Sequence, residues 1–347
     1  MARPRDDDCE ARVSADLNLM GDAAPPRIVL AGGSGFLGGV LARHFAAEGR
    51  EVLILTRQPT RRDDGINEVL WDGRTLGDWA ARLDGALGVI NLAGRSVNCR
   101  YNARNRREIM DSRVHSTAIL GAAIAGCRRP PRIWFNSSTA TIYRHSLDRP
   151  MDEATGEIGP TPEAKDAFSV EVAQAWEAAF AAATTPETRK VALRSAMVLG
   201  RGINSVFPML RRLARFGLGG KMGSGRQFVS WIHEADFCRA IGWLIDRNDF
   251  EGAVNLAAPN PIPNRDMMQS VRHVCGLPFG LPAPGWALEA GAFLLGTETE
   301  LILKSRRVIP SRLRASGFEF QFPEFEAAIR EIENRTAASR LPTFTRP

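Results

Sequence analysis

The sequence has few cysteines, histidines and lysines, and it has no long hydrophobic run. The five cysteines lie far apart, at Cys9, Cys99, Cys127, Cys238 and Cys275, so we expect neither a disulfide framework nor a zinc site. The five histidines form no His-x-x-x-His pair, which gives no reason to expect a metal ion. No segment approaches the ~20 apolar residues of a membrane-spanning helix, and the acidic N-terminus is unlike a signal peptide. We therefore expect a cytoplasmic protein without a membrane partner.

The net charge of +6 is carried mostly by arginine, because there are only four lysines: Lys165, Lys190, Lys221 and Lys304. Nucleic-acid-binding modules interleave basic clusters with aromatic side chains, and no such cluster is present. The arginines between Arg100 and Arg113 have the spacing of a solvated helix face. A small-molecule substrate is therefore expected rather than nucleic acid, and the sequence leaves the oligomeric state open.

Apolar segments alternate with helical patterns from residue 27 onwards. Six segments are predicted to be strands, namely Ile28–Ala31, Val52–Thr56, Glu68–Trp71, Leu87–Leu92, Arg132–Asn136 and Val191–Leu199. The longer predicted helices between them are Gly35–Glu48, Arg104–Gly126 and Ser169–Ala183. This alternation predicts an α/β protein with a Rossmann-type doubly wound parallel sheet, covered by helices on both faces.

The composition also changes along the chain. Residues 1–26 are polar and are predicted to be a flexible leader, and residues 27–199 are predicted to form the nucleotide-binding domain. Glycine and proline separate short elements after residue 200, which predicts a smaller irregular substrate lobe over residues 200–335. Segments of this later region are expected to complete the sheet. Residues 336–347 are predicted to be a tail.

A glycine-rich turn follows the first predicted strand and opens the first predicted helix. Without side chains at Gly32, Gly35 and Gly38, the backbone can approach a pyrophosphate, and the helix N-terminus supplies free N–H groups. Glycines also serve ordinary tight turns, but the strand–turn–helix context favours dinucleotide binding. The residues expected to contact the cofactor here are Gly32, Ser34, Gly35, Phe36, Leu37 and Gly38.

The end of the second predicted strand indicates which dinucleotide is bound. NAD sites usually place Asp or Glu there, whereas this sequence has Thr56-Arg57-Gln58. A guanidinium group can bind a 2′-phosphate in a bidentate way, and an acid would repel it. Arg57 could instead be a solvated loop residue, but we expect NADP as the cofactor, with NADPH preferred over NADH.

These motifs, and others from about Arg27 to about Ile332, resemble the extended short-chain dehydrogenase/reductase superfamily. The order of the motifs resembles the NAD-dependent epimerase/dehydratase group, and in particular an atypical branch of unknown specificity with a C-terminal domain of unknown function. The segments that carry the resemblance are Asn91–Gly94, Asp111–Val114, Ser137–Tyr143, Leu193–Gly200, Gly217–Gly220, Gly225–His233, Ala257–Pro261 and Leu303–Pro323. The resemblance implies that Asp72 contacts adenine and that Leu92, Ala93 and Gly94 border the cofactor.

The chain departs from this superfamily at the catalytic pair, which is a tyrosine with a lysine four residues later. At the expected helix the sequence has Phe168 and Val172, and neither of the two tyrosines has a lysine at that spacing. The standard mechanism is therefore absent. Because a general acid contributes about 10²–10⁴ in rate, its loss is serious for any carbonyl reduction. Because residues four apart share a helix face, Phe168 and Val172 are predicted to face the nicotinamide end of the cleft together. A register shift of one residue would place Ser169 and Ala173 there instead.

Three residues are candidates for the remaining chemistry. Thr139 has the place of the catalytic Ser/Thr in the resemblance, although it could equally satisfy backbone at a strand end. Tyr143 could replace the lost acid or be a residue at the rim. Arg113 could clamp a carboxylate or phosphate or lie on the surface. His233 and Glu234 begin a helix, where capping is the expected role.

Two functions are compatible with these features. The first is an NADP(H)-binding, epimerase-like oxidoreductase acting on a small carbonyl or hydroxyl substrate, with an anionic group on the substrate held by Arg113. The missing catalytic pair also permits a second function, a non-catalytic regulatory protein that senses NADPH.

Overall fold

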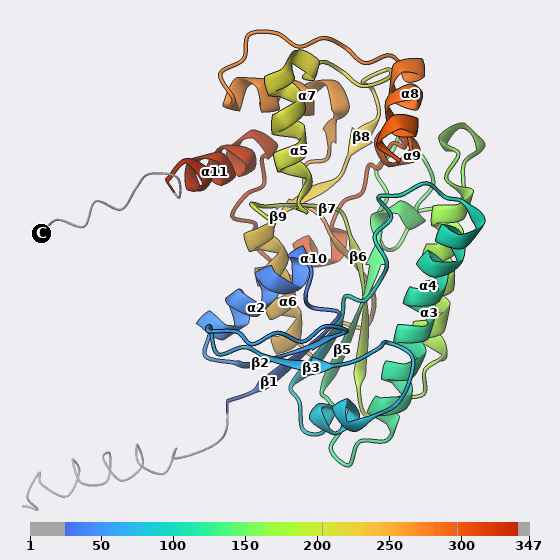
Figure 1. Ribbon diagram of the computed structural model, residues 1–347, viewed down its shortest axis with the longest axis vertical. Coiled ribbons are helices and arrows are strands. Elements are labelled where there is room, and N and C mark those ends of the chain that lie inside the picture. Colours follow the sequence, from blue (N-terminus) through green and yellow to red (C-terminus); the bar gives the residue numbers. More distant parts are fainter. Residues whose placement is uncertain (1–24, 203, 297, 339–347) are drawn as a thin grey trace, which may run out of the picture.

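The computed structural model, which describes residues 25–202, 204–296 and 298–338, contains a seven-stranded sheet with helices on both faces (Figure 1). Its strand order is β10-β6-β5-β4-β1-β2-β3, and every neighbouring pair is parallel. The strands are β1 (Arg27–Ala31), β2 (Glu51–Thr56), β3 (Asn67–Leu70), β4 (Gly88–Asn91), β5 (Ile133–Thr139), β6 (Arg189–Ser195) and β10 (Gly252–Leu256). The predicted Rossmann-type doubly wound fold is confirmed.

Helices pack on the two faces of this sheet because its strands are apolar on both sides. Helices α2 (Phe36–Ala47) and α6 (Glu234–Asp246) cover one face, and α3 (Ala103–Ala125) and α4 (Ala167–Ala182) cover the other (Figure 1). One apolar cluster joins Ile28 and Ile54 to residues of α2 and α6, and another joins Val29 to residues of α3 and α4. Alternate residues of one strand therefore belong to opposite cores.

The strand order reverses at β1, which lies between β4 and β2. Ala31 at the end of β1 pairs with Leu55 on one side and with Asn91 on the other. In open parallel sheets, ligands bind outside the carboxyl ends of the strands at such a reversal. The fold therefore places the glycine turn after β1 at the position where a dinucleotide is expected.

The prediction of a single strand over Val191–Leu199 is wrong. The chain leaves the sheet after β6, and β7 (Met197–Leu199) pairs instead with β9 (Trp231–His233). The segment is apolar on both sides of Arg194 and Ser195, so its pattern does not show that the two halves pair with different strands. The break directs the chain out of the sheet and into the second lobe.

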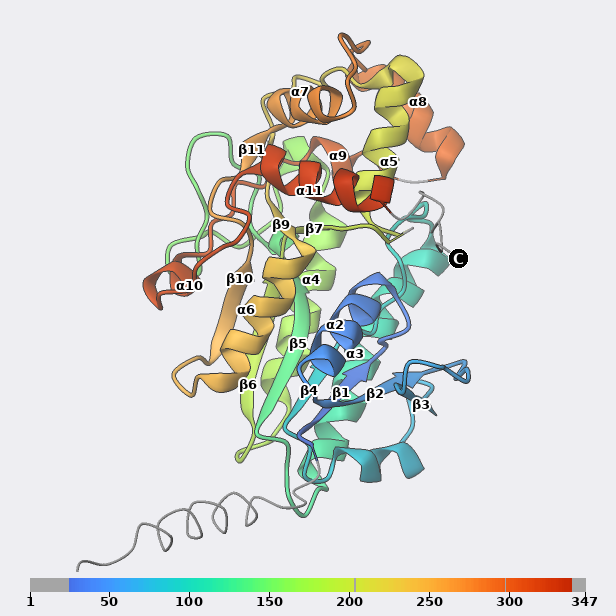
Figure 2. The same ribbon diagram turned by 90° about the vertical axis from the view of Figure 1, so that its left-hand side faces the viewer.

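The second lobe lies over the carboxyl edge of the sheet (Figure 2). Its helical segments are α5 (Val206–Leu213), η4 (Ala214–Leu218), α7 (Asn264–Val274), α8 (Gly285–Leu295), α9 (Glu300–Leu303) and α11 (Phe325–Ala338), and β8 (Phe228–Val229) pairs with β11 (Ile262–Pro263). Its core includes Phe207, Trp231 and Ile329. Two elements that follow residue 200, β10 and α6, pack on the Rossmann part. Helix α10 (Ser311–Ala315) does so too, through Leu313.

Three short helical turns complete the described elements, and they are η1 (Asp78–Leu83), η2 (Ala140–Ile142) and η3 (Pro162–Ala164). Among the helices of the described residues, none is long and apolar enough to span a bilayer. The predicted leader and tail fall almost entirely on residues 1–24 and 339–347, which lie outside the described part of the chain.

Candidate functional site

The glycine turn is packed tightly on one side and open on the other. Gly32 has a φ of +74°, and a Cβ there would lie 2.7 Å from the Ala93 Cα. A Cβ on Gly38 would collide with the backbone of Gly33, so only glycine lets the helix approach the turn this closely. A Cβ on the exposed Gly35, by contrast, would meet no atom within 4 Å. The turn therefore has a rigid inner side and an open outer side at Gly35.

Helix α2 begins behind this open side without a capping side chain. Gly35 is its N-cap, and its first turn contains no acidic residue. The first backbone N–H groups of a helix have no partner within the helix, and they form the positive end of the helix dipole. This uncompensated end, facing the open side of the turn, fits the pyrophosphate of a dinucleotide.

Arg57 lies next to the turn, because the Gly32 N–H donates a hydrogen bond to the Leu55 carbonyl (2.8 Å) near the end of β2. The Arg57 side chain is exposed and makes no hydrogen bond or ion pair with any of the described residues. The nearby Arg62, in contrast, pairs with Asp64 (2.6 Å) and Glu68 (3.3 Å). Arg57 is thus a cation available for an anionic group of a ligand.

A buried amide network holds the predicted cofactor segment Leu92–Gly94 in place. The Asn91 side chain accepts a hydrogen bond from the Ala93 N–H (3.1 Å) and donates to Asn136 Oδ1 (2.7 Å) and Thr117 Oγ1 (3.1 Å). Strands β4 and β5 and helix α3 are therefore joined directly beneath the segment. Ala93 in turn contacts Gly32, so the structure brings these two predicted cofactor regions together.

Asp72 lies in the exposed turn after β3. Its carboxylate accepts hydrogen bonds from the N–H groups of Arg74 (2.8 Å) and Thr75 (2.9 Å) and from the Thr75 hydroxyl (2.8 Å). These bonds hold the pKa of Asp72 below its ordinary value. They give Asp72 a clear role in shaping the turn, and its contact with adenine stays a prediction.

Thr139 and Tyr143 both make structural hydrogen bonds. Thr139 Oγ1 accepts from the Thr141 N–H (3.1 Å) at the end of β5. Tyr143 is 1% exposed, so it does not lie at a rim. Its hydroxyl donates to Asn255 Oδ1 (3.0 Å) and accepts from Arg194 Nη1 (2.9 Å). The Tyr143 hydroxyl is thus enclosed by its partners, and the catalytic role of Thr139 stays a prediction.

Arg113 is a half-buried cation of α3 that packs against the cofactor segment. A Cβ on Gly94 would lie 3.1 Å from the Arg113 Cζ. Its Nη1 donates to the carbonyls of Arg95 (3.1 Å) and Ile109 (3.0 Å), and its guanidinium group lies 5.1 Å from the centre of the Trp176 ring. None of the described carboxylates pairs with it. Burial lowers the pKa of Arg113 to about 10, which still leaves the group charged at neutral pH.

A polar cluster that the sequence did not indicate lies beside α4. It brings together Tyr101, Ser169 and Glu300, because both hydroxyls donate to Glu300 Oε1. Burial raises the pKa of Glu300 and raises that of Tyr101 to about 12. In Figure 1, α9, which carries Glu300, lies above the upper ends of α3 and α4. Glu300 had no sequence signal, since it belongs to no motif and its partners are distant in the chain.

Phe168 and Val172 pack together with Ile109 between α3 and α4. The two side chains share one helix face, as their spacing predicts. The Phe168 ring also contacts Tyr101, with 5.0 Å between the ring centres. The hydroxyl that reaches the polar cluster belongs to the next residue, Ser169. The position of Phe168 relative to a bound nicotinamide stays a prediction.

His233 has the capping role expected for it. Its Nδ1 accepts from the Ala235 N–H (3.1 Å) at the start of α6, and its Nε2 lies 3.0 Å from Glu331 of α11. Burial lowers the pKa of His233. In the described ranges, no three His, Cys, Asp or Glu side chains form a group that could hold a metal ion.

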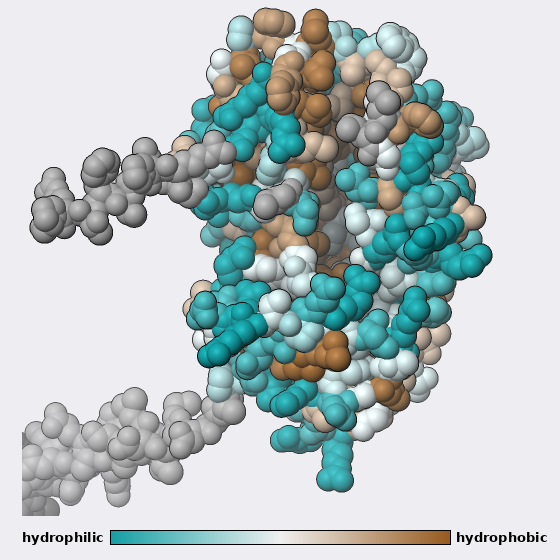
Figure 3. Space-filling model, in the orientation of Figure 1, coloured by the Kyte–Doolittle hydropathy of each residue, from teal (hydrophilic) through white to brown (hydrophobic). Residues whose placement is uncertain are grey.

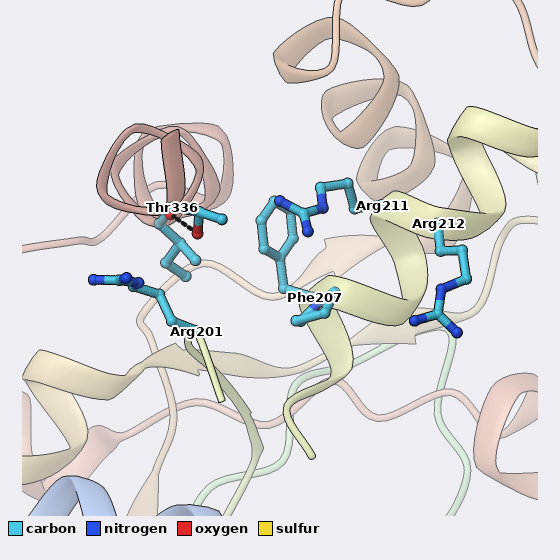
Figure 4. Close-up of a pocket in the computed structure, with 7 residues that line it drawn as sticks. Arg201, Phe207, Arg211, Arg212 and Thr336 are labelled. Carbon is cyan, nitrogen blue, oxygen red and sulfur yellow. Dashed lines mark hydrogen bonds between the residues drawn. The ribbon is translucent and has the colours of Figure 1, made fainter. Parts of the chain in front are cut away.

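The surface is hollowed between the part that contains the sheet and the upper lobe (Figure 3). A separate pocket of about 260 Å³ lies within the upper lobe, between α5 and α11 (Figure 4). Its lining includes Arg201, Phe207 and Arg211, and Arg211 is paired with Glu333 (2.9 Å). None of the predicted cofactor residues lines this pocket, so we place the candidate site at the carboxyl edge of the sheet.

Comparisons with known proteins identify the family. Residues 28–257 match the NAD dependent epimerase/dehydratase family, and residues 283–332 match a domain of unknown function, DUF1731. The epimerase family protein SDR39U1 of Homo sapiens is 32% identical over 310 residues, which are 88% of this chain and 99% of that protein. The epimerase family protein YfhF of Bacillus subtilis is 28% identical, over 88% and 97% of the two chains.

Solved structures give the same result for the fold. The crystal structure of human SDR39U1 (isoform 2) with NADPH has a TM-score of 0.76 and 31% identity, and it covers 91% of this chain and 100% of its own. A nucleoside-diphosphate sugar epimerase from Corynebacterium glutamicum has a TM-score of 0.68 and 26% identity, over 93% and 62% of the two chains.

Proposed function

The chain belongs to the NAD dependent epimerase/dehydratase family, and we propose that it is an NADP(H)-dependent oxidoreductase acting on a small carbonyl or hydroxyl compound. The observation that carries the cofactor assignment is the open space at Gly35, in front of an uncapped helix end without acidic residues. The relative crystallised with NADPH supports the same cofactor. When bound, the nicotinamide supplies or accepts a hydride.

Arg57 is assigned to the 2′-phosphate of this cofactor. It follows β2, where an acid would favour NAD, and it has no partner among the described residues. The segment Leu92–Gly94 would border the nicotinamide half, held from below by Asn91. The chain's own residues thus bind the nucleotide at both ends and orient it along the carboxyl edge of the sheet.

Replacing Arg57 by alanine should remove the preference for NADPH. The wild-type protein is expected to bind NADPH at least about tenfold tighter than NADH, or ~1.4 kcal/mol. The variant should lose most of this difference and keep its NADH affinity, because only the 2′-phosphate contact is removed. Titration of nucleotide fluorescence measures both constants, and Arg62→Ala is the matched control, since Arg62 is already paired with Asp64 and Glu68. Equal affinities in the wild type would contradict the assignment.

Arg113 is assigned to an anionic group of the substrate. A half-buried cation without a carboxylate partner is stabilised when an anion binds, and Arg113 lies against Gly94 at the border of the cofactor segment. Its Nη1 is fixed by two carbonyls, which orients the guanidinium group before the substrate arrives. We therefore propose carboxylate- or phosphate-bearing carbonyl compounds, or the corresponding alcohols, as the substrate class.

The absence of the Tyr–Lys pair supports a second function, an NADPH-sensing regulatory protein. An enzyme oxidises NADPH when a suitable carbonyl compound is present, whereas a sensor binds NADPH and leaves it unchanged. Incubation with aldehydes and ketones that carry a carboxylate or phosphate should lead to loss of NADPH absorbance with at least one of them. Tight binding without turnover across the whole panel would favour the sensor.

A further inference from the structure

The C-terminal domain of unknown function contributes a buried carboxyl group, that of Glu300, to the polar cluster with Tyr101 and Ser169. Glu300, the first residue of α9, is 5% exposed. Its Oε1 accepts hydrogen bonds from the hydroxyl of Ser169 and, at 3.4 Å, from that of Tyr101. No described residue donates to its Oε2. One oxygen is therefore fixed by the protein, and the other is free to exchange a proton with a ligand.

The neighbouring charged groups are largely engaged elsewhere. Lys304 Nζ pairs with Asp166 (2.5 Å) and donates to the Thr141 carbonyl (2.6 Å), and Arg306 Nε donates to Thr141 Oγ1 (3.0 Å). Burial raises the pKa of Glu300, although the Ser169 hydrogen bond and the charges of Arg306 and Lys304 act to lower it. Glu300 therefore keeps its proton to a higher pH than an ordinary glutamate, as a proton donor near neutral pH requires.

Glu300 lies next to the helix position at which the missing proton donor is expected. Its partner Ser169 belongs to the first turns of α4, one residue after Phe168, where the tyrosine of the superfamily is expected. Thr141, which binds the two neighbouring cations, follows Thr139 at the end of β5. The carboxyl group thus lies at the carboxyl edge of the sheet, beside the strand end and the helix that carry the catalytic residues of relatives.

On the basis of the proposed function, we propose that Glu300 is the catalytic proton donor and acceptor of this chain, with Ser169 and Tyr101 as positioning residues. In reduction, the carbonyl carbon gains the hydride from bound NADPH, and the carbonyl oxygen gains the proton of the Glu300 carboxyl group. The C=O π bond is lost, a C–H bond and an O–H bond form, and NADP⁺ and the Glu300 carboxylate remain. Water then returns a proton to the carboxylate, and alcohol oxidation is the reverse sequence.

Glu300→Gln tests this role, because glutamine is nearly isosteric and has no exchangeable carboxyl proton. With NADPH and the panel of carboxylate- or phosphate-bearing carbonyl compounds, its turnover should fall by about 10²–10⁴, while its NADPH affinity is unchanged. Wild-type reduction should slow as the pH rises through the pKa of Glu300, because the acid form is consumed. This pH dependence should disappear in Glu300→Gln and return in part in Glu300→Asp. Glu289→Gln is the matched control, since Glu289 is an exposed carboxylate of α8 paired with Lys165.

Infrared difference spectra of wild type and Glu300→Gln give a readout that does not depend on activity. The carbonyl band of the protonated carboxyl group should persist well above pH ~4.3, the ordinary glutamate value, and it should be missing from the variant. Unchanged turnover and pH dependence in Glu300→Gln, or ionisation of Glu300 in the ordinary range, would overturn its role alone. If the wild-type protein oxidises NADPH with no member of the panel, the proposed function itself fails.

Discussion

Gly35→Val should abolish NADPH binding while leaving the fold intact. A Cβ at Gly35 meets no protein atom within 4 Å, so the folded chain has room for the valine side chain. That room is the space assigned to the pyrophosphate, in front of the first N–H groups of α2. We expect the affinity for NADPH to fall by at least about 100-fold, or ~2.7 kcal/mol, as measured by calorimetric titration.

Gly39→Ala is the control for this variant. Gly39 lies one turn further along α2, and a Cβ there makes only an ordinary contact of 3.5 Å with the Arg43 side chain. It should keep full affinity and gain a little stability, because alanine is favoured over glycine within a helix. Normal NADPH binding by a folded Gly35→Val protein would show that the nucleotide does not cross the turn at this residue.

Lys304→Met should lower the free energy of unfolding by about 3–5 kcal/mol, the usual cost of breaking a buried ion pair. Lys304 and Asp166 both have fully buried side chains, and their charged atoms are 2.5 Å apart. Removing the ammonium group leaves the Asp166 carboxylate buried without its counter-ion. Because Asp166 precedes α4 and Lys304 belongs to the C-terminal domain, the pair also joins that domain to the Rossmann part.

Lys165→Met is the comparison for Lys304→Met. Lys165 is adjacent to Asp166 in the chain, but its side chain is 74% exposed and it pairs with the exposed Glu289. Exposed pairs contribute at most about 1 kcal/mol, so this variant should unfold in urea nearly as the wild type does. The double variant Lys304→Met with Asp166→Leu should recover part of the loss, since neither member of the pair then leaves the other as a buried charge without its counter-ion. Equal stability of Lys304→Met and Lys165→Met would contradict the account of the pair.

The fold was predictable because its signals are local. Most strands of the sheet contain a short apolar run, although β3 begins with two polar residues, and the glycine turn falls between the first strand and the first helix. A short run does not reveal its partner, however. The residues from Val191 to Leu199 are apolar on both sides of Arg194 and Ser195, yet β6 pairs in the main sheet and β7 pairs with β9.

The candidate site was predictable only on its cofactor side. Gly32 and Ala93 occur in motifs, and the structure brings them into contact. The proton-transfer side is built by long-range contacts, since Glu300 meets Ser169 and Tyr101 from positions 131 and 199 residues away. No pattern within α9 marks Glu300, which was found from its burial and its hydroxyl partners. Tyr143 shows the converse. It belongs to the motif Ser137–Tyr143, but the motif did not reveal that its hydroxyl is enclosed by Arg194 and Asn255.

The central claim, that this chain transfers a hydride between NADP(H) and a small carbonyl compound, is tested most directly with stereospecifically deuterated cofactor. The wild-type protein is incubated with 4-pro-R or 4-pro-S deuterated NADPH and the panel of carboxylate- or phosphate-bearing carbonyl compounds. Mass spectrometry then follows the deuterium into the alcohol products. Deuterium from only one of the two labelled cofactors is expected in a product, and Gly35→Val is expected to transfer none. Tight NADPH binding with both deuterium labels retained across the panel would contradict it.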